Sequence, residues 1–350
     1  MMNKRKLYII LSVAVVLMTL LSAGIYKGVR RYRYTRCNFV SIDGEEHGYF
    51  VRPGVPLDSI FARVQRDYTM LSPHAFRKDL EHVGLREPKI GYYRFPAEMG
   101  NRTLMMRLRQ GEQTPVKLRF SYTVRTNEQL ASRLAPQLLI DSATIIGLLQ
   151  CDTFLAKYGV NTETARCLFL PDTYEVYWTM TGEQLFDRMY REYQRFWNDD
   201  RQAQARALGL TPQEVTTLAS IVTSETNTKW EYPIIAGLYL NRMRIGMHLQ
   251  ACPTAVYATR KFSARRVTHE MTSYPSPYNT YINPGLPPGP IRVTPAEIID
   301  STLHATKSKY LYMCANPDFS GTHVFSENYT KHAATARVYQ HELNKRKIRK

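Results

Sequence analysis

Several common site signatures are missing from this sequence of 350 residues. Its five cysteines, Cys37, Cys151, Cys167, Cys252 and Cys314, form no CxxC pair and have no zinc-ligand spacing with histidine. We therefore predict mostly buried thiols, and neither a disulfide framework nor a metal site. No HExxH, GxSxG or glycine-rich phosphate loop occurs, which argues against zinc peptidases, serine hydrolases and nucleotide-dependent enzymes. We expect a protein that needs no cofactor.

Acidic residues are scarce relative to basic ones. The chain has 47 Lys and Arg against 30 Asp and Glu, a formal net charge of +17. Such a chain is expected to work beside a polyanion, an anionic membrane or an acidic polymer. Apolar residues make up 44% of the chain, which supports a sizeable core and excludes wholesale disorder. The length suits two domains.

The longest apolar run lies near the N-terminus. Leu7 to Tyr26 comprises 20 residues without a charge, and a helix of this length spans about 30 Å, the thickness of a bilayer core. A cleaved signal peptide is the alternative, but its apolar region is usually only about 7–15 residues long and no A-x-A site follows here. We therefore predict an uncleaved transmembrane helix over residues 7–26, after a cytoplasmic N-terminus of residues 1–6.

Basic residues flank this helix on both sides and do not decide its orientation. Those before it are Lys4, Arg5 and Lys6, and those after it are Lys27, Arg30, Arg31, Arg33 and Arg36. Counting alone favours a cytoplasmic body under the positive-inside rule. If the body is exported, the arginines that follow the helix would lie beside lipid head groups.

The rest of the chain divides into a smaller and a larger part. Residues 38–120 predict a small α+β binding module with strands at Phe39–Ile42 and Gly91–Phe95 and helices at Pro56–Val64, Pro73–Val83 and Thr103–Arg109. Residues 121–151 predict a connecting strand–helix segment, since the strand pattern of Val116–Val124 precedes helices that open at Thr126 and Asp141. Residues 152–350 predict a mixed, mainly helical domain whose last helix covers Val324–Lys350. The fold class is therefore α+β.

One carboxylate is placed unusually on a predicted helix. Thr211, Pro212 and Glu214 form a helix start with a capping box. The apolar stripe that follows is Val215, Leu218, Ala219 and Val222, and Glu225 is its next position. Burial and the C-terminal end of the helix would both raise the pKa of Glu225, which suits a general acid. The alternative is a structural glutamate paired with Arg242 or Arg244.

Two later segments have the composition of a binding cleft. The first runs through Asn241–Gln250 and turns at Gly246. The second begins with Tyr278-Asn279-Thr280-Tyr281 and continues into the rigid segment Gly285–Ile291. Tyr and Asn together can stack on a sugar and hydrogen-bond to it. An ordinary polar loop stiffened by prolines is an equally valid interpretation.

At this point five ordered motifs resemble one family. They are Phe169–Tyr174, Leu218–Thr226, Asn241–Met247, Leu249-Gln250 with Pro253-Thr254, and Tyr278–Tyr281 with Gly285–Ile291. Together they resemble the YceG-like family, the MltG-type endolytic murein transglycosylases. The resemblance covers nearly the whole chain. It implies a single N-terminal membrane helix, a LysM-like module at 38–120 and a catalytic domain at 152–350, with the body on the periplasmic, outer face of the bacterial inner membrane.

The resemblance also implies a mechanism and its residues. Glu225 matches the family's catalytic glutamate, and Arg242, Gln250, Thr254, Tyr278, Asn279 and Tyr281 are the expected substrate-binding residues. The enzyme would be a lyase that cleaves the MurNAc–GlcNAc β-1,4 bond of peptidoglycan and leaves 1,6-anhydro-MurNAc ends, which limits nascent strand length. Peptidoglycan synthases or divisome proteins are the expected protein partners. The sequence departs from the family at Thr223 and at Ala251-Cys252, where relatives often carry Glu and Thr-Asp.

Two other functions stay open. A non-catalytic peptidoglycan-binding or scaffold protein could share the fold, although it would not need an acid on an apolar stripe. A membrane-tethered nucleic-acid binder would account for the charge, but no RRM, KH or helix-turn-helix signature occurs in the sequence. We therefore expect no nucleic-acid partner.

Overall fold

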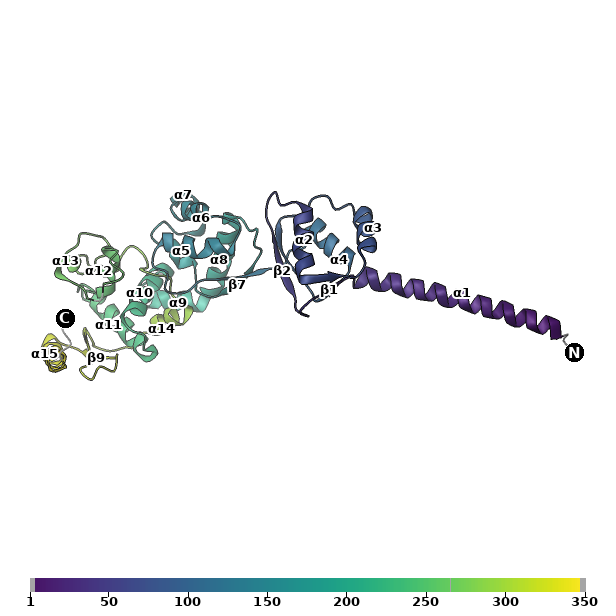
Figure 1. Cartoon of the computed structure of the whole chain (residues 1–350). Helices are drawn as coiled ribbons and strands as arrows, with labels where there is room; N and C mark the ends of the chain where they lie inside the picture. Colours follow the sequence, from purple (N-terminus) through teal and green to yellow (C-terminus); the bar gives the residue numbers. More distant parts are fainter. Residues whose placement is uncertain (1–3, 265, 347–350) are drawn as a thin grey trace. The chain divides into compact units, whose positions relative to one another are not determined.

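The computed structural model describes residues 4–264 and 266–346, and the chain forms two compact units (Figure 1). The first unit contains Met1–Val116 together with Glu175–Thr179, and the second contains Lys117–Tyr174 and Met180–Lys350. The segment 121–151, which the sequence treats as a connection, lies within the second unit. The overall class is α+β and mostly helical, as predicted.

A long apolar helix begins the first unit. Helix α1 covers Lys4–Arg36, and its stretch Tyr8–Tyr32 is long and apolar enough to cross a membrane, with a mean hydropathy of 2.4 in its most apolar window. Its described side chains are exposed, as a lipid-facing helix requires. The helix continues for ten residues beyond the predicted end at Tyr26. Such a helix is consistent with a single-pass anchor or with a signal sequence.

The rest of the first unit packs three helices against short strands. Strands β1 (Phe39–Ser41), β3 (Tyr68–Met70) and β5 (Glu98–Met99) form a sheet in the order β3-β1-β5, and β2 (His47–Val51) pairs antiparallel with β4 (Gly91–Phe95). The helices are α2 (Leu57–Asp67), α3 (Pro73–Val83) and α4 (Asn101–Gln110). The predicted strand at Gly91–Phe95 and helix at Pro73–Val83 are confirmed, and Gly84 and Gly111 end their helices in left-handed conformations.

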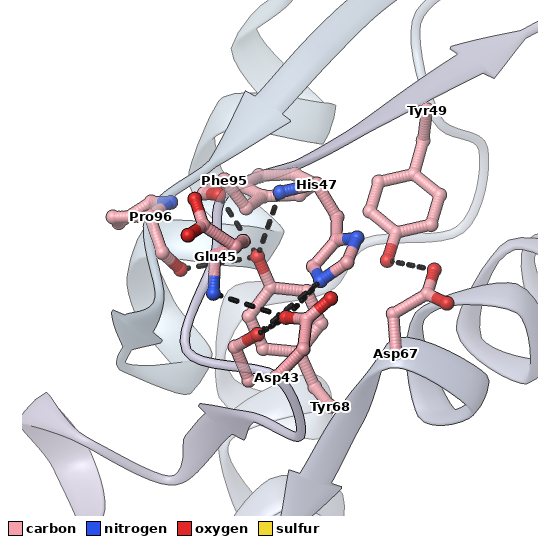
Figure 2. Close-up of polar contacts among 9 residues, drawn as sticks. Asp43, Glu45, His47, Tyr49, Asp67, Tyr68, Phe95 and Pro96 are labelled. Atoms are coloured by element: carbon pink, nitrogen blue, oxygen red, sulfur yellow. Dashed lines mark hydrogen bonds and ion pairs between the residues drawn. The ribbon is translucent and has the colours of Figure 1, made fainter.

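A polar network fixes the turn between β1 and β2 (Figure 2). The Asp43 carboxylate accepts hydrogen bonds from Glu45 N and Ser41 Oγ and contacts Nε2 of His47 at 2.9 Å. These bonds hold the pKa of Asp43 far below its usual range. The buried Tyr68 hydroxyl donates to Phe95 O at 2.8 Å, so β3 is tied to the end of β4. We interpret this cluster as structural, because its polar groups bind one another.

The second unit is mainly helical. Its helices are α5 (Asn127–Leu134), α6 (Ser142–Leu149), α7 (Asp152–Leu155), α8 (Gly182–Phe196), α9 (Asp199–Ala207), α10 (Pro212–Glu225), α11 (Tyr232–Arg244), α12 (Cys252–Ala258), α13 (His269–Thr272), α14 (Ala296–Leu303) and α15 (Tyr329–Lys345). Its short 3-10 turns are η1 (Ala135–Gln137), η2 (Ala156–Tyr158), η3 (Ala165–Leu168) and η4 (Lys229–Glu231). Helices α10, α11 and α14 pack on one another and form the centre around which the candidate site is built.

Two predicted elements of the second unit are wrong in extent. The strand expected over Val116–Val124 ends at Arg119, and this strand, β6 (Val116–Arg119), pairs with β7 (Thr173–Val176). The helix expected over Val324–Lys350 begins only at Tyr329, because Asn328 caps it by accepting a hydrogen bond from Lys331 N. Residues before the cap form β9 (His323–Ser326), which pairs antiparallel with β8 (Tyr312–Ala315). The end of that prediction, residues 347–350, lies outside the described residues.

Candidate active site

Helix α10 carries the predicted acid at its last position. The capping box is present as predicted: Thr211 Oγ1 accepts from Glu214 N at 3.2 Å, and Glu214 Oε2 accepts from Thr211 N at 2.7 Å. Residues 215–223 are all buried, so the helix is enclosed on every side and not on one stripe alone. Its buried hydroxyl side chains donate to carbonyls of the same helix, which satisfies them without water.

The Glu225 carboxyl is held by a tyrosine and not by an arginine. Tyr239, on α11, donates its hydroxyl to Glu225 Oε1 at 2.7 Å and is itself 1% exposed. Burial raises the pKa of Glu225, although the Tyr239 hydrogen bond and the charges of His323 and Arg242 lower it. The raised pKa follows the predicted direction. No ion pair to Glu225 occurs among the described residues, so the paired structural glutamate is not observed.

Arg242 is buried near this carboxyl, and its guanidinium binds backbone carbonyls. Its guanidinium donates to Leu311 O at 2.6 Å and to Leu249 O at 2.5 Å. Burial lowers the pKa of Arg242, and its charge lowers that of Glu225. Arg244, the other predicted partner, is exposed and donates to Asn241 Oδ1. Arg242 therefore joins α11 to the segments around Leu249 and Leu311 and also contributes positive charge near the acid.

The two predicted cleft segments lie side by side. Gln250 N donates to Thr280 O at 3.0 Å, and the hydroxyls of Thr254 and Thr280 are 2.8 Å apart in a fully buried position. Gln250 has a φ of 48°, in the left-handed region, and its side chain is exposed. Thr254 thus joins the two segments, whereas Gln250 is available to solvent.

The aromatic and amide groups of the second segment have separate surroundings. The Asn279 amide is fully buried and donates to the carbonyls of Met271, Thr272 and Tyr274, so it organises the loop. The Tyr278 hydroxyl donates to Glu163 Oε2, so it is engaged by a different carboxylate from Glu225. The Tyr281 hydroxyl lies 3.1 Å from Cys252 Sγ. Desolvation raises the pKa of both of these groups, and the nearby Glu225 carboxyl contributes to the rise. Glu225 thus contributes to the pKa shift of Tyr281 and not to that of Tyr278.

A cavity of about 260 Å³ opens at the Glu225 carboxyl. Its lining residues are Arg125, Ser224, Glu225, Cys252, Pro253, Val256, Tyr257, Phe262, Ala264, Ile291 and Arg292. Glu225 is the single carboxylate among them. Within the described part of the chain, no three His, Cys, Asp or Glu side chains are grouped so as to hold a metal ion. The cavity therefore offers one acid of raised pKa, two guanidinium groups and an apolar wall.

Sequence reasoning missed Tyr239, Arg125 and Arg292. Tyr239 stands on a helix whose other positions are mostly apolar, so its sequence context resembles ordinary core. Arg292 directly follows the Gly285–Ile291 motif, and Arg125 directly follows the predicted strand Val116–Val124. Because both arginines directly follow a predicted segment, their positions were the one indication in the sequence that they could belong to the site. Nothing in the sequence shows that both side chains converge on one cavity.

Comparison with known proteins finds one matching family and several named relatives. The sequence profile described as the YceG-like family matches residues 49–338. A protein named endolytic murein transglycosylase from Streptococcus pneumoniae is 28% identical over 338 residues, which cover 86% of this chain and 60% of that protein. This chain thus spans only about 60% of the length of its streptococcal relative. A protein of the same name from Bacillus subtilis is 25% identical and is covered to 84%, as is this chain.

One solved structure has a similar fold. The crystal structure of a yceG-like protein from Listeria monocytogenes superimposes with a TM-score of 0.55 at 23% identity and covers 83% of this chain and 98% of that one. At this identity the likeness concerns the fold alone.

Proposed function

Because the chain belongs to the YceG-like family, we propose that it is an endolytic lytic transglycosylase in which Glu225 is the catalytic acid. The substrate is a peptidoglycan glycan strand, and the bond cleaved is the β-1,4 bond from MurNAc to GlcNAc. The observation that carries the proposal is a solitary carboxyl of raised pKa that lines a cavity and receives one hydrogen bond from Tyr239. The names of the relatives support the substrate class.

A single carboxyl is enough for this reaction. Glycosidases that add water use two carboxylates, one as acid and one as base or nucleophile. In a lytic transglycosylase the C6 hydroxyl of MurNAc attacks its own C1, so no external nucleophile is needed. Glu225 first gives its proton to the bridging oxygen as GlcNAc leaves. The resulting carboxylate then takes the C6 hydroxyl proton, and the product carries a 1,6-anhydro ring.

The lining of the cavity agrees with this chemistry. Glu225 has no second carboxylate beside it among the described lining residues, and Cys252 occupies a position where relatives often have Asp. The residue Cys252 is exposed at the surface, but desolvation of its thiol raises the pKa of Cys252 and so favours the neutral thiol. With Glu225 as the one carboxylate among its described lining residues, the cavity agrees with a mechanism that uses a single carboxyl.

The other predicted binding residues divide into two proposed roles. Gln250, with an exposed side chain, and Tyr281, beside Cys252, are proposed to contact the glycan and stabilise the oxocarbenium-like state. Thr254, Asn279 and Arg242 have their polar groups engaged within the protein and are proposed to position the site. Tyr278 binds Glu163 and is proposed to hold the same loop from behind.

Helix α1 is proposed to anchor the enzyme in the bacterial inner membrane, with the second unit on the outer face. The span Tyr8–Tyr32 has the necessary length and hydropathy. Cleavage within strands close to the membrane would limit the length of new glycan. Peptidoglycan synthases or divisome proteins are the proposed neighbours, and the first unit is proposed to act as a LysM-like module.

The experiment is digestion of purified sacculi by the full-length chain in detergent, with mass spectrometry of the glycan ends. The parent should release anhydro-MurNAc ends. Glu225→Gln should reduce the rate by about 10²–10⁴-fold, the usual contribution of a general acid. Glu327→Gln is the matched control, because Glu327 is exposed and makes no ion pair among the described residues.

Three results would contradict the proposal. Reducing ends in place of anhydro ends would make the chain a hydrolase. Equal rates in the parent and Glu225→Gln would remove the catalytic role of Glu225. Binding of glycan without any cleavage by the parent would favour the alternative, a non-catalytic peptidoglycan-binding or scaffold protein.

A further inference from the structure

Two arginines share the cavity of Glu225 without a carboxylate of their own. Arg125 and Arg292 both line it, and neither forms an ion pair with any described residue. Arginine side chains are seldom buried unless they are paired with an acidic group. Arg292 is nevertheless only 8% exposed. The pair is therefore an unusual concentration of uncompensated positive charge at the proposed reaction site.

The hydrogen bonds of Arg292 leave part of its guanidinium unused. Its Nε donates to Tyr122 O at 2.8 Å, and its Nη1 donates weakly to Thr223 O and Ser224 Oγ, both at 3.4 Å. All three acceptors are neutral. No hydrogen bond from Nη2 occurs within the described chain. This nitrogen is also not one of the fully buried side-chain atoms that lack a hydrogen-bond partner, so it keeps some accessible surface. The protein thus fixes one edge of the guanidinium and leaves the other edge accessible.

Arg125 is fixed in a similar way. Its Nη1 donates to Phe262 O at 3.3 Å, and its guanidinium lies over the Phe262 ring at 5.0 Å. Arg292 correspondingly lies over the Tyr122 ring at 5.2 Å. Stacking and backbone bonds orient both planes without neutralising either charge. Burial, together with the charge of Arg125, lowers the pKa of Arg292 to about 10.

From this geometry we infer that Arg125 and Arg292 form a carboxylate-binding subsite beside Glu225, which recognises an acidic substituent of the glycan substrate. The inference rests on the proposed function for the identity of the substrate. Guanidinium groups with free, fixed N–H donors match a carboxylate, and such charge-assisted bonds are strong in an enclosed site. Each MurNAc has a lactyl group whose carboxyl is free when the stem peptide is absent, and stem peptides carry further carboxylates.

Two other features of the chain do not indicate a ligand. A larger groove between α9, α11 and α14 is lined by a mixture of apolar and basic groups, and nothing indicates what would occupy it. The buried Glu231 and the half-buried His323 already bind one another. The arginine pair differs because its open donors face a cavity that also contains the acid.

The test measures binding and not turnover. Full-length Glu225→Gln in detergent is titrated with glycan fragments in four forms: peptide-free or peptide-bearing, each with its carboxylates intact or converted to neutral amides. We expect amidation to weaken binding about tenfold or more, the loss expected for one charge-assisted hydrogen bond. If the effect is confined to peptide-free glycan, the lactyl carboxylate is the ligand. If it is confined to peptide-bearing glycan, the stem peptide supplies it.

Variants connect the effect to the two side chains. Arg125→Gln, at a partly exposed position, should remove most of the preference for intact carboxylates, and Arg292→Lys should weaken it while keeping the charge. Arg133→Gln, an exposed arginine outside the cavity, should bind like the parent. Equal binding of intact and amidated glycan by the parent would overturn the inference, as would full preference in Arg125→Gln. If Glu225→Gln prefers intact carboxylates but the chain with Glu225 in place yields no anhydro ends from sacculi, only the proposed function is refuted.

Discussion

The buried carboxylate of Glu231 allows a sharp test of how the end of α10 is held. Glu231 is fully buried and accepts three hydrogen bonds: from Thr226 Oγ1 at 2.7 Å, from His323 N at 2.6 Å, and from His323 Nδ1 at 3.1 Å. Thr226 directly follows Glu225, and His323 begins β9. One carboxylate therefore joins the residue after the proposed acid to a strand about a hundred positions later.

Replacing Glu231 by Gln keeps the shape and removes the charge. A hydrogen bond to a charged group contributes about 1.5–3 kcal/mol and a neutral one about 0.5–1.5 kcal/mol, so each converted bond loses roughly 1 kcal/mol. All three partners donate to the carboxylate, whereas one end of the Gln amide is an NH₂ group that cannot accept. One of the three bonds is therefore lost, unless its partner turns so that it accepts a hydrogen bond from the NH₂ group. Over the three bonds these effects are expected to reduce the local stability of the β9 junction by about 3 kcal/mol. Amide exchange of His323 should then be roughly 100-fold faster.

Hydrogen–deuterium exchange with mass spectrometry, on the full-length chain in detergent, measures this change. The faster exchange should be found in peptides that contain β9 and the α10–α11 junction, and not in α8. Glu327→Gln is the matched control, since it removes a carboxylate next to β9 that is exposed. Unchanged exchange of β9 in Glu231→Gln would refute the role assigned to these bonds, and so would an equal acceleration in Glu327→Gln.

Three further predictions concern the site and its loop. Gly289→Ala should destabilise the chain by about 1–3 kcal/mol, because a Cβ there would lie 2.2 Å from Glu163 O; a thermal shift measurement that shows no change would contradict this. Tyr239→Phe removes a hydrogen bond that lowers the pKa of Glu225. Activity of a general acid is lost as pH rises through its pKa, so a pH–rate profile should show the alkaline limb at higher pH, and an unmoved limb would refute the assignment. Alkylation of Cys252 with N-ethylmaleimide should obstruct the cavity and abolish glycan cleavage, whereas Cys252→Ser should stay active after the same treatment.

Local chemistry explains which parts of the fold could be predicted. The start of α10 was predicted because Thr211, Pro212 and Glu214 satisfy one another within a single turn. The end of the helix Pro73–Val83 was predicted because glycine favours the left-handed conformation that ends a helix, and Gly84 adopts it with a φ of 62°. By contrast, Val324 belongs to a strand because it pairs with Cys314 across the hairpin, and this partner cannot be recognised from the local pattern.

The candidate site shows the same division between local and distant causes. Glu225 stood out because a carboxylate on an apolar stripe conflicts with its surroundings, and that conflict is visible in the sequence. The role of Asn279 was predicted from its residue type as sugar binding, but the structure directs its amide to backbone carbonyls of the preceding turn. Arg125 and Arg292 lie 167 positions apart and meet only through tertiary packing. The sequence therefore indicated which residue types could bind a glycan. It could not indicate which of their polar groups are engaged within the protein and which face the cavity.

The placement of the acid follows from how α10 satisfies its own polar groups. Its hydroxyl side chains donate back to carbonyls one turn earlier, so the helix can be buried on every side without partners from elsewhere. Glu225 cannot do this, because a carboxylate only accepts hydrogen bonds and the helix end presents carbonyls. Among the described residues its one hydrogen-bond donor is Tyr239, and the negative end of the helix disfavours its ionised form further. Burial and the helix end therefore both favour the protonated form of a carboxyl at this position, which is the form that the proposed general acid needs before the bond breaks.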